Sequence, residues 1–347
     1  MSKTFRRMLI GFLFGFVVYL ALLLIGDAQQ VGSQLRAFDW QLVPLILAGT
    51  LFNYILRFIK WHYYLGLIGI TNIDKWMSAR IFVAGFPLAV TPGKIGEALK
   101  GVWLNHTSGV STSHAMSVVL AERISDGLAV LALSTLGVIA YPQYWPAFAL
   151  VLGGLVVFIL LTQFQSLAMN IIEKLGRLPW LRGASAQLQS FYTGTNLLFR
   201  PAATLTAVLL GIFAWLGEGI AMYLVLLGLG VDSGVETFSL AVFILSFSTV
   251  IGAVSAMPGG IGAAEVSIAG MLALLLGLAA DTAAAATIII RFATLWFGVA
   301  LGLISWIFSR DFLLPQEPTA GGPSGDAPTD PSRDEEQFSH EAGSSLP

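Results

Sequence analysis

The chain has 347 residues, of which 56% are hydrophobic and only 11% charged, and its formal net charge is −2. Soluble domains carry closer to a quarter charged residues, so this composition excludes an ordinary soluble domain, and the absence of cysteine excludes disulfides and thiolate metal sites. Apolar runs of roughly 18 or more residues recur, which is long enough to span a bilayer as helix. They lack the alternation of a membrane barrel. The sequence predicts an all-α polytopic membrane protein.

The predicted spanning helices, in chain order, are 8–26, 42–59, 112–140, 144–162, 201–229 and 283–308. We expect the first to be an uncleaved helix, because its apolar run exceeds a typical signal-peptide core; a signal peptide ending near Gly26 and Ala28 is the alternative.

Basic residues predict the orientation, because Lys and Arg favour the cytoplasmic side. They occur before the first helix, after the second, in the segment 163–200 and after the last; the residues used are Lys3, Arg6, Arg7, Arg57, Lys60, Lys75, Arg80, Lys174, Arg177, Arg182, Arg200 and Arg310. Both termini are therefore expected on the cytoplasmic side of a bacterial-type inner (plasma) membrane.

Two further regions, 78–105 and 237–278, are apolar but interrupted by Pro-Gly. The alternation of basic segments holds only if each region returns to the side from which it enters. We therefore predict two re-entrant helix pairs, the first entering from the cytoplasm and the second from outside. Non-helical backbone at membrane depth is tolerated against protein or a water-filled cavity, so both breaks are expected to line a cavity.

The two breaks read "PGKIGE" at 92–97 and "PGGIGAAE" at 258–265. In both copies the glutamate precedes an arginine by 26 residues, Glu97 to Arg123 and Glu265 to Arg291. This predicts an internal duplication with opposite topology, an architecture typical of transporters. The alternative is chance recurrence of Pro-Gly in a chain with 37 glycines.

The predicted domains follow from this repeat. Residues 1–310 form the transmembrane domain, with repeat one at about 42–140 and repeat two at about 201–308. Residues 311–347 are rich in Pro, Gly, Ser and acids, which predicts a disordered acidic cytoplasmic tail.

Ionisable residues inside spanning helices need a partner, water or a ligand. Glu122, Arg123 and Asp126 are neighbours on one helix, so they form either an intrahelical ion pair or, because carboxylates are in excess, leave Arg123 free for an anion. Arg291 has no carboxylate nearer on its helix than Asp281, so its partner is Glu265, Glu218 or a bound anion.

Glu218 has no basic neighbour on its own helix. Burial disfavours the charged carboxylate, which makes Glu218 the best candidate for proton coupling; an interhelical hydrogen bond to Ser, Thr or backbone is the alternative. Glu97 and Glu265 begin helices, where the dipole favours an acid, but glycine-rich helix starts also bind anions. Lys94 adds a positive charge at the first break only.

The first motif region contains "PGKIGEALK" followed by "ERISD", and the second contains "PGGIGAAE" followed by a helix with a lone arginine. The two motif regions resemble the flippase-like domain family. This is the transmembrane region of lysylphosphatidylglycerol synthases and their stand-alone relatives. The resemblance covers roughly residues 8–308 and implies transport of a lipid rather than its synthesis, since no synthase half is expected here. The positions carried over by resemblance are Pro92, Gly93, Gly96, Glu97, Glu122, Arg123, Asp126, Pro258, Gly259, Gly262 and Glu265.

The sequence thus predicts a non-enzymatic flippase for an anionic or phosphate-bearing lipid: a phospholipid, an aminoacylated lipid or a polyprenyl-linked lipid. Lys94, Arg123 and Arg291 are the predicted phosphate-binding residues. Glu97 and Glu265 are expected to pair with the two arginines when no lipid is bound. Gly260 completes the second break, and Glu122, Asp126 and Glu218 are the buried-charge or proton-coupling candidates. No cofactor, metal or nucleic acid is expected. The alternatives are a small-solute transporter and a non-catalytic subunit of a glycolipid or polyprenyl-linked pathway.

Overall fold

The computed structural model describes residues 3–91, 96–138, 145–164, 169–170, 174, 182–255, 257–309 and 313. Every regular element within these ranges is helical. Pro92, Gly93 and Lys94 lie outside the described residues, as does the predicted tail 311–347 apart from residue 313.

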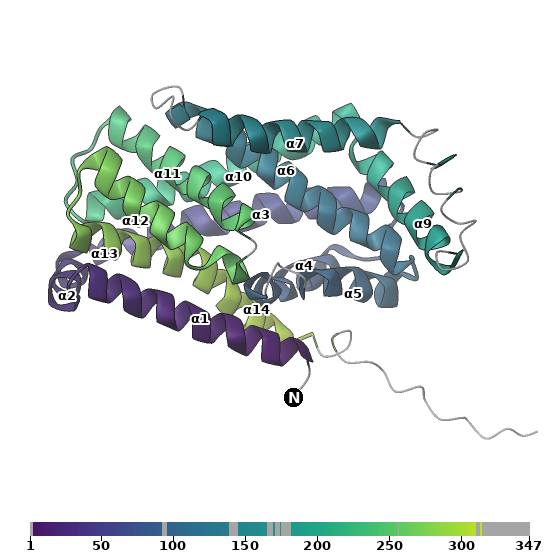
Figure 1. Ribbon diagram of the computed structural model, residues 1–347. Helices are drawn as coiled ribbons and strands as arrows, with labels where there is room; N and C mark the ends of the chain where they lie inside the picture. The colour runs from purple at the N-terminus through teal and green to yellow at the C-terminus, as the bar shows by residue number, and fades with distance from the viewer. Residues whose placement is uncertain are drawn as a thin grey trace, which may run out of the picture. The chain divides into compact units, whose positions relative to one another are not determined.

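The first half of the chain contains long helices on either side of a short-helix region (Figure 1). Its elements are α1 (Lys3–Ile25), α2 (Ala28–Ala37), η1 (Trp40–Leu42), α3 (Val43–Leu67), α4 (Lys75–Ala84), η2 (Phe86–Val90), α5 (Leu99–Ser108), α6 (Thr112–Val138) and α7 (Trp145–Gln163).

The second half has longer helices around its break. Its elements are α9 (Arg182–Leu198), α10 (Pro201–Gly228), α11 (Val235–Val254), η5 (Pro258–Gly260), α12 (Ala263–Leu276), α13 (Ala280–Arg291), the π-helical turn η6 (Phe292–Trp296) and α14 (Phe297–Ile307).

Among the described residues, five helical stretches are long and apolar enough to cross a membrane: Trp40–Leu67, Pro201–Gly228, Val235–Val254, Pro258–Leu276 and Ala280–Ile307. A bent pair, Leu13–Leu24 with Ala28–Ala37, is a sixth candidate. The predicted all-α polytopic class is confirmed. The predicted span 112–140 forms α6, but Glu122, Arg123 and Asp126 make it less apolar than these five.

One predicted boundary is wrong, and the error matters. The second span was expected to end at residue 59, and Arg57 and Lys60 were counted among the basic residues at its end; instead α3 continues to Leu67. Both side chains are buried. Hydropathy penalises charges without regard to partners, and here α6 supplies carboxylates that compensate them. Arg57 and Lys60 therefore carry no information on orientation.

The two Pro-Gly regions form helical hairpins that enter the bundle from opposite ends. At one end, Asn72 before α4 bonds the Ser108 carbonyl at the end of α5 (3.2 Å), and Arg80 of α4 bonds the Phe308 carbonyl just after α14. At the other end, Gln34 of α2 bonds Asp281 at the start of α13, immediately after the α11–α12 hairpin (2.9 Å). The stretch from α13 to α14, 28 residues long, connects the two ends.

The tips of the hairpins meet inside the bundle. Val90 of η2 and Ile261, which follows η5, are fully buried in one cluster with Val299 of α14. For the first hairpin this arrangement agrees with the predicted re-entrant pair, because α4 and α5 have 10 residues each and are too short to span a bilayer. In the second hairpin α11 has 20 residues, so helix length alone does not distinguish re-entry from spanning.

Close packing of α3 on α10 brings the two halves together beside the hairpin tips. A Cβ atom on Gly49 would lie 2.6 Å from the Gly217 carbonyl oxygen, so only glycine permits this approach. The contact places Tyr54 and Arg57 of α3 beside Glu218 of α10.

Candidate functional site

The second hairpin tip is bonded to α13 through a buried Glu–Arg pair. Gly262 has a φ of 87° and precedes α12, whose first turn contains Glu265. Glu265 is fully buried and accepts from the Gly262 amide (2.6 Å) and from Arg291 Nε (2.6 Å). Arg291 also donates to the Gly259 carbonyl (3.3 Å). The Arg291–Glu265 contact therefore fixes the broken backbone to the following helix.

The equivalent pair is present at the first hairpin tip. Arg123 Nε lies 3.1 Å from Glu97 Oε2, and both residues match Arg291 and Glu265 in motif and spacing. Thr91 joins the two sides of the break, because its hydroxyl accepts from the Gly96 amide (2.8 Å). The predicted pairing of each motif glutamate with the arginine 26 residues later is what the structure shows.

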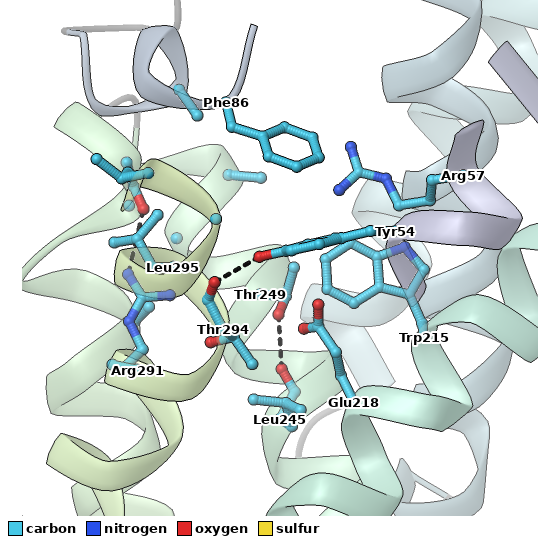
Figure 2. Close-up of a pocket in the computed structure, with 18 of the residues that line it drawn as sticks. Tyr54, Arg57, Phe86, Trp215, Glu218, Leu245, Thr249, Arg291, Thr294 and Leu295 are labelled. Carbon is cyan, nitrogen blue, oxygen red and sulfur yellow. Dashed lines mark hydrogen bonds between the residues drawn. The ribbon is translucent and has the colours of Figure 1, made fainter. Parts of the chain in front are cut away.

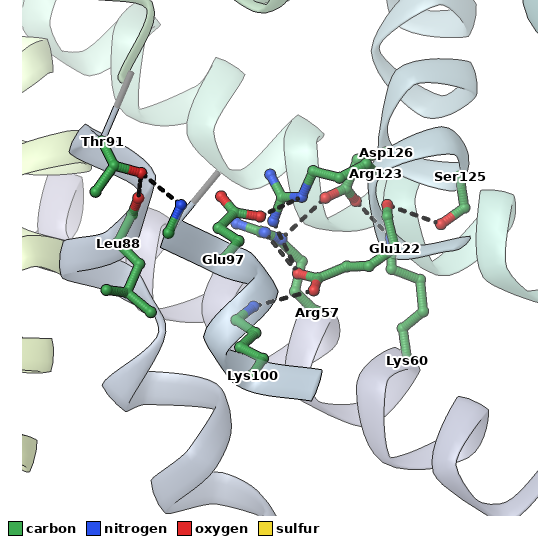
Figure 3. Close-up of polar contacts among 11 residues, drawn as sticks. Arg57, Lys60, Leu88, Thr91, Glu97, Lys100, Glu122, Arg123, Ser125 and Asp126 are labelled. Atoms are coloured by element: carbon green, nitrogen blue, oxygen red, sulfur yellow. Dashed lines mark hydrogen bonds and ion pairs between the residues drawn. The ribbon is translucent and has the colours of Figure 1, made fainter. Parts of the chain in front are cut away.

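The first pair belongs to a larger buried network that α3, α5 and α6 assemble (Figure 3). Glu122 receives Arg57 (2.8 Å), Lys100 (3.2 Å) and Arg123 (3.1 Å). Asp126 is bonded to Lys60 and lies 3.2 Å from Arg57 Nε. Four cations and three carboxylates are thus in contact in the described part of this region.

The structure shows the expected intrahelical ion pair on α6, between Arg123 and its neighbour Glu122 rather than Asp126. Arg123 also pairs with Glu97, so it is not left free by an excess of carboxylates. Asp126 is compensated from α3, by Arg57 and Lys60, which were expected at the end of the second helix as markers of its cytoplasmic side. Lys100, inside the first motif segment, was not singled out.

A pattern in the sequence indicates these missed contacts. Arg57 and Lys60 are three residues apart and face one side of a helix, and Glu122 and Asp126 are four apart on another. Two helix faces with complementary charge at matching spacing predict an interhelical pair of bridges once α3 is extended.

A small pocket of about 140 Å³ lies where the hairpin tips meet α3 and α10. Its charged lining residues are Arg57, Arg123, Glu218 and Arg291. Tyr54, Trp215 and Phe86 form its aromatic walls (Figure 2). Tyr54 donates to the Thr294 carbonyl inside the π-helical turn (2.6 Å). Such turns occur often at functional sites. Three of the predicted functional side chains, Arg123, Glu218 and Arg291, therefore share one cavity.

Glu218 differs from the other carboxylates of the site. It is 6% exposed, its carboxylate faces the pocket, and it forms no hydrogen bond or ion pair with any described residue (Figure 2). The alternative expectation of a structural hydrogen bond is therefore not met among those residues.

A larger groove of about 620 Å³ adjoins the small pocket. The two share Arg57, Arg123, Trp215, Thr249 and Ala253. Beyond this junction the groove is lined mainly by apolar side chains of α6, α7, α9 and α11: Met116, Val119, Leu120, Ile124, Val130, Val151, Leu155, Phe191, Val250 and Val254. A charged chamber thus leads into an apolar one. Among the described residues, no three His, Asp or Glu side chains gather as a metal site requires.

The fold and site define a polytopic helical membrane protein with two opposed broken hairpins around a charged cavity. The chain belongs to the lysylphosphatidylglycerol synthase TM region family, whose pattern matches residues 8–302. It is also similar to two UPF0104 membrane proteins of Methanothermobacter thermautotrophicus. One is 24% identical over 311 residues, 84% of this chain and 91% of the relative. The other is 23% identical over 313 residues, 83% of this chain and 91% of the relative.

Proposed function

We propose that this protein is a lipid transporter that moves an anionic or phosphate-bearing lipid between leaflets without catalysing a reaction. The observation that carries the proposal is the continuity of the arginine-lined pocket with the apolar groove. A lipid has the same two-part chemistry, because its phosphate needs cationic donors and its chains need apolar surface.

Arginine suits the phosphate, since its planar guanidinium donates to two oxygens at once. Arg123 and Arg291 are held by Glu97 and Glu265 in this structure. A lipid phosphate would compete with these carboxylates for the guanidinium groups. Exchange of a carboxylate for a phosphate would loosen each hairpin tip from its neighbouring helix. The head group would then cross in a polar chamber and avoid the cost of entering hydrocarbon without partners.

The kind of membrane and the orientation of the chain in it are also proposals. We propose a bacterial-type plasma membrane with the N-terminus cytoplasmic, based on the basic N-terminal residues and the two-ended arrangement of the loops. The natural absence of cysteine permits a direct test. Single cysteines at Ser33 and at Asn72, both exposed and at opposite ends, should react with a membrane-impermeant reagent from opposite sides. Labelling of both from one side would contradict the topology.

The proposal is tested by measuring leaflet-to-leaflet movement of labelled lipids in proteoliposomes. The panel contains phosphatidylglycerol, lysylphosphatidylglycerol and a polyprenyl phosphate. Ala253 lines both cavities and is exposed, so Ala253→Trp should block the junction without disturbing a packed core. Ile251→Trp is the matched control, because Ile251 lies on the opposite face of α11 and lines neither cavity.

Movement of one lipid class, lost in Ala253→Trp and kept in Ile251→Trp, is the expected result. Absence of movement for every lipid with folded protein would refute lipid translocation. A small-solute transporter, or a non-catalytic subunit of a glycolipid or polyprenyl-linked pathway, would then be the better-supported hypothesis.

A further inference from the structure

Glu218 is the one carboxylate of the described site residues that the ion-pair groups leave unused. Its burial is nearly complete, at 6% exposure, and its carboxylate faces the central pocket (Figure 2). Charging a carboxylate in such a place is costly without a hydrogen-bonded partner. The position therefore requires a proton on the carboxylate, or a compensating charge nearby.

The groups that face Glu218 come from the helices packed against α10. They are Tyr54 and Arg57 from α3, Arg123 and Asp126 from α6, Thr249 from α11, and Arg291 from α13. Each charged member of this set is already bonded to a residue other than Glu218. Glu218 thus interacts electrostatically with these charges without a hydrogen bond or ion pair to any of them.

In the described part of the site, the formal charges balance only when Glu218 is counted. Among the described residues of both groups, five cations contact four carboxylates: Arg57, Lys60, Lys100, Arg123 and Arg291 against Glu97, Glu122, Asp126 and Glu265. One positive charge therefore remains, and it is cancelled when Glu218 is ionised. If Glu218 carries a proton, the site has room for one additional negative charge.

We propose that binding of a phosphodiester monoanion in the central pocket is coupled to the uptake of one proton by Glu218. The inference rests on the proposed function, and adds to it the charge of the substrate and the form of its coupling. An ionised Glu218 repels an incoming anion, and a protonated Glu218 leaves the arginines to it. By reciprocity, the bound anion raises the proton affinity of Glu218 by the same factor.

This coupling has a consequence for the driving force of transport. An anion and a proton that cross together move no net charge. Transport of a lipid with a net charge of −1 therefore gains driving force from a pH difference across the membrane and is insensitive to membrane voltage.

The test is calorimetric binding to detergent-solubilised protein, with dioctanoyl phosphatidylglycerol as probe. Its phosphodiester carries one negative charge between pH 5 and 9, so any pH dependence belongs to the protein. Titration in buffers with different ionisation enthalpies counts the protons taken up. The chain-free head group, glycerophosphoglycerol, is the second arm and separates phosphate recognition from lipid recognition.

We expect uptake approaching one proton per bound anion above the pH at which free Glu218 titrates, with affinity rising up to about tenfold for each unit that the pH falls. Glu218→Gln should bind tightly at all pH values, with no proton uptake. Glu218→Asp should restore uptake, which a purely structural role would not do. Glu236→Gln, a change at an exposed residue of α11, should behave as wild type.

Three outcomes would overturn the inference. Anion binding by wild type without proton uptake would refute the coupling and leave the proposed function intact. Unchanged uptake in Glu218→Gln would assign the proton to another group. Failure of wild type to bind either probe at any pH would refute both the phosphate site and the coupling.

Discussion

The two hairpin tips carry the same Glu–Arg pair but surround it differently. At the second tip, Arg291 contacts Glu265, the Gly259 carbonyl and the Tyr19 side chain, and Glu265 also caps its own helix. At the first tip, Arg123 contacts both Glu97 and Glu122, and Glu122 has two further cations. Among the described residues the second pair has no further ion-pair partner, whereas the first is part of a redundant network.

This difference shows what the two hairpins have in common. Both halves keep the contact that fixes a broken hairpin to the next spanning helix. Only the first half surrounds it with additional charges, which leaves the first tip with alternative partners if one contact opens. We infer that the first arginine is the easier of the two to release.

The largest expected effect is the loss of an isolated partner. Glu265→Gln leaves Arg291 buried without a carboxylate, which should cost about 3–5 kcal/mol. Glu97→Gln leaves Arg123 with Glu122 and should cost only about 1 kcal/mol. Thermal unfolding in detergent, followed by the fluorescence of the nine tryptophans, measures both. Equal losses in the two variants would show that the network gives no redundancy.

The second prediction separates stability from transport. In the double variant Glu265→Gln with Arg291→Met, both charges are absent, so most of the stability lost in Glu265→Gln should return, to within about 1–2 kcal/mol of wild type. Lipid movement should remain absent, because the phosphate ligand is gone. Transport by the double variant at the wild-type rate would exclude Arg291 from the phosphate site.

The third prediction compares the last glycines of the two motifs. A Cβ on Gly262 would meet nothing closer than 3.6 Å, so Gly262→Ala is strained by its backbone, with φ at 87°, and should cost about 1–3 kcal/mol. A Cβ on Gly96 would lie 2.7 Å from Thr91 Oγ1, so its difficulty is a side-chain clash. Thr91→Ala should therefore partly rescue Gly96→Ala and leave Gly262→Ala unimproved. Unfolding midpoints of the four variants test this, and equal rescue of both glycine variants would contradict it.

The smallest expected effect concerns the contact between the halves. Tyr54→Phe removes the hydrogen bond to the Thr294 carbonyl and should cost about 1 kcal/mol. Tyr223→Phe, at a tyrosine with ring contacts and no hydrogen bond among the described residues, is the control and should be near neutral. If both variants unfold alike, Tyr54 does not connect the halves energetically.

Much of the site was predictable, because it depends on spacing. The motif and the 26-residue separation anticipated which glutamate meets which arginine. Arg57 and Lys60 were misplaced because hydropathy treats a charge as solvent-seeking, and a charge with a buried partner is not. Lys100 was overlooked for the same reason, since its partner Glu122 is on another helix.

The sequence by itself determined the class of protein, the approximate helices, the two breaks and the candidate partners of the two motif arginines, because each is a local property or a repeated spacing. Only the tertiary structure decided which charges share a cavity. It joined Arg123 and Arg291 around Glu218, and it gave every charged residue of the described network except Glu218 an ion-pair partner. Coulombic and hydrogen-bonding partners are chosen by distance in space, and helices far apart in the chain meet only through packing.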